Sequence, residues 1–169
     1  MIMERRTIIF GALSFLILWC IGINANAQDI SGKFVLSTSE YFSPKTGANT
    51  TEIGVGYLFD HAGVKINYER ICLAEDRDVN GGTVSILVPA YNVRTFSIIP
   101  EVSAGILQGN VVTDDESCVK SQLQAGVNIN YTLSRTMSCG VTCKSLFYSE
   151  GVIPLIGWSY SIHFWPSTV

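Results

Sequence analysis

Apolar residues at helical spacing are missing from this chain beyond residue 28, and charged residues of either sign are few. Asp, Glu, Lys and Arg make up only 15% of the sequence. Without the first 27 residues, which contain Glu4, Arg5 and Arg6, nine basic and 13 acidic residues remain. Because this remainder has no basic surplus, we exclude nucleic acid as a partner.

Signatures of catalysis and metal binding are also absent. The sequence has no Cys-x-x-Cys pair and only two histidines, His61 and His163, which argues against a zinc site of the usual ligand spacing. It lacks the Gly-x-Ser-x-Gly nucleophile elbow, the phosphate loop and the dinucleotide fingerprint. We therefore predict neither an enzyme nor a cofactor-binding protein.

The first 27 residues have the three parts of a secretory signal in order. Arg5 and Arg6 form the charged start, an apolar stretch covers 7–23, and Ala25-Asn26-Ala27 places small residues where a signal peptidase reads them. An uncleaved anchor is the alternative, because about 17 apolar residues are at the lower limit for spanning a bilayer. We predict a signal peptide over 1–27 and a single exported domain over 28–169, whose length suits one core.

The exported part consists of eight runs of about ten residues in which apolar and polar side chains alternate. The run 122–131 is the clearest, and the last run, Ile156 to Phe164, repeats its pattern. The run 83–92 is the weakest, because Pro89 cannot donate to a strand ladder. Each run therefore predicts a β-strand with one dry and one wet face.

The connections between the runs alternate in length. Tight turns are expected at 60–62, 92–95 and 133–135, and longer polar links at 43–49, 75–82, 108–117 and 148–153. With eight up-and-down strands, all tight turns fall at one end and all long links at the other.

Alternation fits a soluble sandwich with its apolar faces inside or a membrane barrel with them outside. Strands of about 9 to 11 residues cross a bilayer, and an even number of strands closes without a free edge. Aromatic residues lie near the tight turns at Phe59, Phe96, Tyr131, Phe164 and Trp165, and near the long links at Phe42, Phe147 and Tyr148. Because aromatic rings suit membrane interfaces, we predict an all-β, eight-stranded, antiparallel, up-and-down transmembrane β-barrel.

The polar faces would then line the barrel interior. A structural network of paired charges is predicted for Lys65, Glu69, Glu101, Lys120 and Lys144. Lipid contact is predicted for Leu123, Val127, Ile129, Trp158, Tyr160, Ile162 and Phe164. Because eight strands enclose only enough room for side chains, we expect no open pore.

Three features together resemble a known family: the ending Ala25-Asn26-Ala27, the eight runs with alternating links, and the last run Trp158-Ser-Tyr160-Ser-Ile162-His-Phe164. They are similar to small outer-membrane β-barrels, the class of outer-membrane protein X and the OmpA transmembrane domain. The resemblance implies a place in the outer membrane of a Gram-negative envelope, with its lipid and the barrel-assembly machinery as partners. In that family an aromatic residue usually ends the chain, whereas here residues 165–169 follow Phe164.

A weak calcium candidate is formed by Asp76, Asp78 and Asn80, whose spacing matches the first half of a calcium loop. Val84 and Leu87 occupy the ninth and closing positions, so acids from 114–116 would have to complete the site. A solvated acidic hairpin tip is the alternative.

The cysteines of the exported part give no disulfide framework. Cys139 and Cys143 are predicted on the dry face of one strand, about 13 Å apart and too far to bond. Cys72 and Cys118 lie near long links, and a bond between them is left open.

These patterns predict a structural, surface-contact or envelope-assembly role carried by the long links, with another envelope or surface protein as a further partner. A soluble secreted β-sandwich or ligand-binding barrel is the alternative. An outer-membrane lipid-modifying enzyme would need a Ser or His with a carboxylate at the long-link end. His163 is instead predicted as an interior hydrogen-bonding residue at the short-turn end.

Overall fold

The computed structural model describes residues 32–72, 78–93, 95–109, 119–134, 136–148 and 151–164. These residues form nine strands: β1 (Lys33–Phe42), β2 (Asn49–Leu58), β3 (Gly63–Cys72), β4 (Asp78–Leu87), β5 (Tyr91–Val93), β6 (Phe96–Gln108), β7 (Val119–Ser134), β8 (Met137–Tyr148) and β9 (Gly151–Phe164). None of the described residues belongs to a helix long and apolar enough to cross a membrane. The predicted signal peptide lies outside the described residues.

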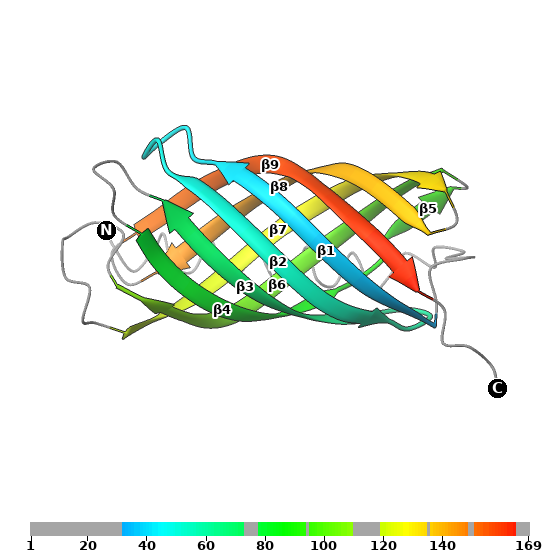
Figure 1. Cartoon of the computed structure of the whole chain (residues 1–169), viewed down its shortest axis with the longest axis horizontal. Coiled ribbons are helices and arrows are strands. Elements are labelled where there is room, and N and C mark those ends of the chain that lie inside the picture. Colours follow the sequence, from blue (N-terminus) through cyan, green and yellow to red (C-terminus); the bar gives the residue numbers. More distant parts are fainter. Residues whose placement is uncertain are drawn as a thin grey trace, which may run out of the picture.

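The strands form one antiparallel sheet that closes on itself through β1 and β9. β4 and β5 both pair with β6 and occupy one strand position, interrupted at 88–90 around Pro89. The fold is therefore the eight-stranded, up-and-down, all-β barrel that the sequence predicts, with strands inclined to the long axis (Figure 1).

The register fixes the shape of the barrel. A row of paired residues that starts at Phe164 passes through Phe34, Val64 and Val102 and returns to β9 at Pro154, ten residues before its start. With a rise of about 3.3 Å per residue and about 4.8 Å between strands, this stagger gives a tilt of about 41° and a radius of about 8 Å. The interior of such a barrel is largely filled by its own side chains.

The apolar faces point outward. Ile129, Trp158 and Ile162 are 41%, 56% and 38% exposed, while polar residues of the same strands, such as Asn128 and Ser159, are buried. A sandwich would have buried these apolar residues in a dry centre. The soluble β-sandwich alternative is therefore wrong.

Two of the predicted long links are wrong in extent. β8 and β9 are joined through 149–150 alone, because Tyr148 pairs with Gly151 and the ladder continues to the tip. Pro154 is tolerated there because β9 extends past its last pair with β1, Phe42–Ile156. Similarly, β4 begins at Asp78, so the predicted link 75–82 contains strand. The longest links are those that follow β1 and β6, at 43–48 and 109–118.

Candidate functional site

The barrel interior has three layers from the loop end to the short-turn end: an apolar cluster, a charged network and a hydroxyl-lined cavity. All three layers are made of inward-pointing side chains, because every second residue of each strand points into the barrel. The charged network is the middle layer and contains most of the predicted site residues.

Glu52 is the centre of the charged network. Its side chain is 1% exposed and accepts hydrogen bonds from two lysines. Lys65 Nζ lies 3.0 Å from Glu52 Oε1, and Lys144 Nζ binds Glu52 Oε2. Lys144 Nζ also lies 4.1 Å from the ring centroid of Tyr41, a cation–π contact. One carboxylate thereby links β2, β3 and β8 across the interior.

The other two carboxylates of the network are held by amides and hydroxyls as well as by lysines. Gln124 Nε2 donates to both oxygens of Glu69 at 2.8 Å, and Thr83 Oγ1 donates to Glu69 Oε1 at 3.1 Å. Glu101 lies 3.2 Å from Lys65 Nζ and accepts a 2.8 Å bond from Asn128 Nδ2. Each buried carboxylate thus has several partners, and the network cross-links the strands, although Gln124 Oε1 is buried without a hydrogen-bond partner among the described residues.

Glycine makes room for the charged side chains. In register, Lys65 lies opposite Gly56, and Gly126 lies between Lys144 and Glu101. A Cβ atom on Gly126 would approach Lys144 Cα to 2.9 Å. The long side chains therefore cross the interior over positions that carry no side chain of their own.

An apolar cluster fills the interior beside the network. Its buried members are Tyr41, Ala48, Ile71, Val79, Leu107, Leu146, Ile153 and Leu155. Tyr148 packs against this cluster, so its predicted place in the outer aromatic belt is wrong. The cluster and the network fill successive layers of the interior with buried side chains.

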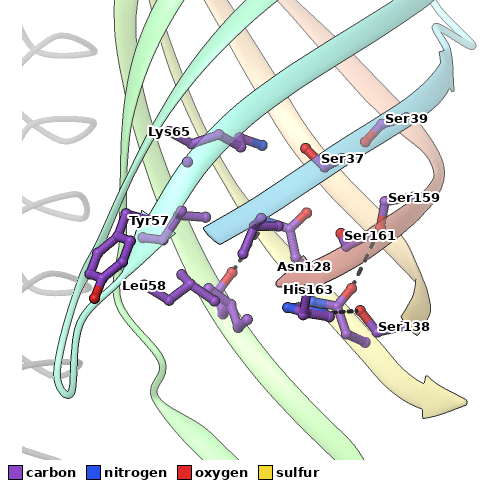
Figure 2. A pocket seen from close by; sticks show the side chains of 15 residues that line it. Ser37, Ser39, Tyr57, Leu58, Lys65, Asn128, Ser138, Ser159, Ser161 and His163 are labelled. Carbon is purple, nitrogen blue, oxygen red and sulfur yellow. Dashed lines mark hydrogen bonds between the residues drawn. The ribbon is translucent and has the colours of Figure 1, made fainter. Parts of the chain in front are cut away.

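A cavity near the short-turn end leaves about 50 Å³ for the centres of water molecules, enough for a few of them. Figure 2 shows hydroxyl groups from β1, β8 and β9 around it, with Lys65 at its inner end. The serines that line it are Ser37, Ser39, Ser138, Ser159 and Ser161. A second buried apolar cluster, Val35, Leu58, Leu87 and Ile99, also lines it. We interpret it as a blind, hydrated recess.

His163 lies in this recess at the short-turn end, as predicted. Its Nε2 is 2.9 Å from Ser138 Oγ, whereas its buried Nδ1 has no protein partner among the described residues. A nucleophilic serine needs a histidine oriented by a third group and a nearby oxyanion site. No carboxylate lines the recess, so the pair makes a hydrogen bond without the geometry of a catalytic triad.

The outer face carries an apolar band with aromatic rings at its short-turn limit and a charged residue at its loop-end limit. Two residues along a strand rise about 5 Å along the axis, and each step to the next strand in a register row rises about 3 Å. The outward aromatic rings at the short-turn end therefore all lie within about 6 Å of the height of Phe164. These rings belong to Phe34, Tyr57, Phe59, Phe96, Tyr131 and Phe164. Arg70, the outward charge on β3, lies about 24 Å above Phe164.

All seven residues predicted to contact lipid lie on outward-facing positions of β7 and β9. Trp158, Tyr160, Ile162 and Phe164 are exposed, and Leu123 and Val127 are half-buried between neighbouring side chains. Position on the outer face is thus observed, while contact with lipid stays a prediction.

Four of the five predicted network residues, Lys65, Glu69, Glu101 and Lys144, meet in the interior. Lys120 has the inward parity of β7 but lies at the loop end, half-buried. Sequence reasoning missed Glu52, although its alternation with Ile53 and Val55 places it on the wet face of β2.

The calcium candidate has a different setting from the one predicted. Asp78 binds Arg70, and Asn80 Oδ1 accepts a 2.8 Å bond from Tyr68, all within strands. Among the described residues, no three His, Cys, Asp or Glu side chains are grouped as metal ligands. Asp76 and 114–116 lie outside the described residues, so the site stays a prediction.

The cysteines of β8 lie as predicted. Cys139 and Cys143 carry free thiols on the outer face, four residues apart. Cys72 is also a free thiol in the structure. Cys118 lies outside the described residues, and the bond between Cys72 and Cys118 stays open.

Comparison with known proteins gives structural matches only. No protein-family model matches the sequence, and no curated protein matches it. The N-terminal β-barrel domain of Pseudomonas aeruginosa OprF is similar, with a TM-score of 0.61 and 12% identity over 79% of this chain and 98% of that chain. Neisserial surface protein A gives a TM-score of 0.61 at 11% identity, covering 79% and 98%.

The Yersinia pestis outer membrane protein Ail also matches, with a TM-score of 0.54 and 13% identity over 79% of this chain and 100% of that chain. At such identities the likeness shows the fold. The predicted resemblance is confirmed at that level: the chain has the fold of the small eight-stranded outer-membrane β-barrels.

Proposed function

We propose that this chain is an integral outer-membrane protein whose barrel is a closed, non-conducting scaffold that presents its loop end for contact with other molecules. The outer face carries the proposal: an apolar band about 24 Å tall, with aromatic rings at one limit and polar residues at the other, matches the band of about 25 Å that membrane barrels present to lipid. Insertion would rely on the barrel-assembly machinery and on contact with outer-membrane lipid.

The filled interior supports a scaffold rather than a channel. Leu107 and Leu146 are 1% exposed in the apolar cluster, and Glu52 and its two lysines occupy the next layer. The hydrated recess ends at this layer, so solutes that enter it from the short-turn end have no continuation. An interior held by paired buried charges resists opening because an unpaired charge there is costly.

The link between β1 and β2 supports a role in surface contact, because it has a defined shape. Ser43 is fully buried and Ala48 is 1% exposed, and Gly47 adopts a positive φ of 70° that closes the turn. Lys45 Nζ donates to the carbonyl of Val152 at 3.0 Å, which fixes the link to the β8–β9 tip. A shaped surface at the loop end suits recognition of another envelope or surface protein.

Three measurements test the proposal. An unboiled sample should migrate differently from a boiled one on a denaturing gel, and the folded protein should float with lipid vesicles. In planar bilayers it should show no conductance steps above background. Recovery as a folded, detergent-free protein in the periplasmic fraction would contradict the membrane location, and steady ohmic conductance would contradict the closed scaffold.

A further inference from the structure

The charged residues of the outer face are confined to one side of the barrel. Among the outward positions of the described strands, charged side chains occur at Glu40 on β1, Arg70 on β3 and Asp78 on β4. The described outward positions of β6, β7, β8 and β9 carry no charge. The two sides of the barrel therefore differ in how well they suit lipid.

A row of polar residues crosses the charged side in register. Glu40 pairs with Thr51, and Thr51 pairs with Arg70. Arg70 pairs in turn with Asn80 on β4. From β1 to β4 this polar row climbs from about 18 Å to about 28 Å above the height of Phe164. The continuous apolar surface on this side ends below the row.

The polar row is largely satisfied within the barrel, yet it stays exposed. Tyr68 donates to Asn80, and Arg70 donates to Asp78. The side chain of Arg70 is nevertheless 56% exposed. Glu40 is exposed as well, and its carboxylate forms no hydrogen bond or ion pair within the described part of the chain. Because exposed charges are unfavourable in hydrocarbon, the row favours contact with water and lipid head groups.

On the uncharged side, apolar residues continue to a greater height. Ile106 on β6 is 58% exposed at about 26 Å. Phe147 on β8 and Val152 on β9 are half-buried at about 27 and 30 Å. The polar residues nearby, Ser121 and Ser145, are small and uncharged. Acyl chains can therefore cover this side well above the height of Glu40.

The short-turn rim is level on both sides. Phe34 on β1 and Phe96 on β6 are four strand positions apart and therefore lie on opposite sides of the barrel. Their heights are about 3 and 1 Å above Phe164. A tilt of the whole barrel would displace both of its rims relative to the membrane. Unequal limits at the loop end above a level rim mean that the apolar surface itself is shorter along β1 to β4.

We propose that the outer face of β1 to β4 binds a locally thinned membrane, in which head groups and water of the leaflet at the loop end descend to the polar row. The proposal rests on the membrane location proposed above. A bilayer adjusts to a short apolar surface by thinning beside it. Phe42, at about 23 Å on β1, then lies among head groups, where an aromatic ring is favourable. Along β6 to β9 the same leaflet keeps its full thickness.

Nitroxide labels on single cysteines test the uneven leaflet. Thr51→Cys labels the polar row, and Ala104→Cys on β6 is the matched control, because both residues are exposed and lie at about 21 Å. The background has alanine in place of the four cysteines of the exported part, Cys72, Cys118, Cys139 and Cys143.

The labelled proteins are placed in vesicles of palmitoyl-oleoyl phosphatidylcholine. Collisions of the label with oxygen, which concentrates in hydrocarbon, are compared with collisions with a water-soluble nickel chelate. We expect nickel collisions to dominate at position 51 and oxygen collisions to dominate at position 104. Equal ratios of oxygen to nickel collisions at the two positions would overturn the proposal.

A second pair of labels separates local thinning from a tilted barrel. Phe34→Cys and Phe96→Cys lie at the short-turn rim on opposite sides, and thinning of the leaflet at the loop end predicts the same ratio of collisions at both. Ratios that differ there in the same sense as at positions 51 and 104 would show a tilt and overturn the thinning. Heat-modifiable migration and flotation of the cysteine-free parent are measured separately, and the loss of both would refute the membrane location itself.

Discussion

Neutralising Glu52 is the sharpest perturbation of the interior, because one carboxylate serves two buried lysines. Glu52→Gln keeps the shape of the side chain and removes its charge. Breaking a buried ion pair by removing one partner costs about 3–5 kcal/mol. Lys65 keeps Glu101 at 3.2 Å, and Lys144 keeps a more distant Glu69 at 3.9 Å. We therefore expect the lower end of that range, about 3 kcal/mol, which lowers the folding equilibrium constant by about two orders of magnitude.

The assay is reversible urea unfolding in lipid vesicles, followed by tryptophan fluorescence and by gel mobility without boiling. Glu40→Gln is the matched control, since the same substitution on the outer face of the adjacent strand should change the free energy of unfolding of the monomer by less than about 1 kcal/mol. Glu52→Gln combined with Lys144→Met should cost less than the sum of the single changes, because it removes both members of one pair. Equal, small effects of Glu52→Gln and Glu40→Gln would refute the network.

Three further perturbations have defined outcomes. Leu146→Ala should destabilise the barrel by about 2–5 kcal/mol through a cavity in the apolar cluster, measured by urea unfolding; a change below about 1 kcal/mol would contradict its close packing. Ile86→Arg should cost about 2–4 kcal/mol because Ile86 is exposed at mid-height of the apolar band between Val64 and Val102, whereas Phe164→Arg at the lower limit should cost about 0–1 kcal/mol, and equal costs would contradict the assigned depth. Gly126→Val should reduce the yield of heat-modifiable barrel, because its side chain would occupy the space of the Lys144 stem, and a normal yield would show that the stem has another route.

Much of the fold follows from one periodicity. In 122–131 and 156–164 each apolar residue is separated from the next by a polar or small one, and a strand of period two places the two kinds on opposite faces without information from elsewhere. An even number of such strands with both faces satisfied leaves closure as the way to remove the edges. The barrel and the inward charges Lys65 and Lys144 were therefore predictable.

The errors arose where local signals compete with pairing. Gly151 and Pro154 read as a loop, yet the register with β8 keeps them in the ladder at a point where β9 has no partner on its other edge. Glu52 was missed because its wet face continues as Gly54 and Gly56, which look like an uncharged strand until Lys65 from β3 is seen to cross over them and Lys144 from β8 to bind Glu52. Contacts between distant strands decide both cases, and a single sequence does not display them.

The most direct test of the account is a methyl NMR measurement on the protein in lipid nanodiscs. Outward methyl groups of Ile53, Ile66 and Ile156 should show nuclear Overhauser effects to lipid acyl chains. Methyl groups of Leu107 and Leu146 should show nuclear Overhauser effects to neighbouring side chains of the interior and none to lipid. Acyl-chain contacts at Leu107 and Leu146, with protein-only contacts at the three isoleucines, would contradict the orientation on which the barrel's function depends.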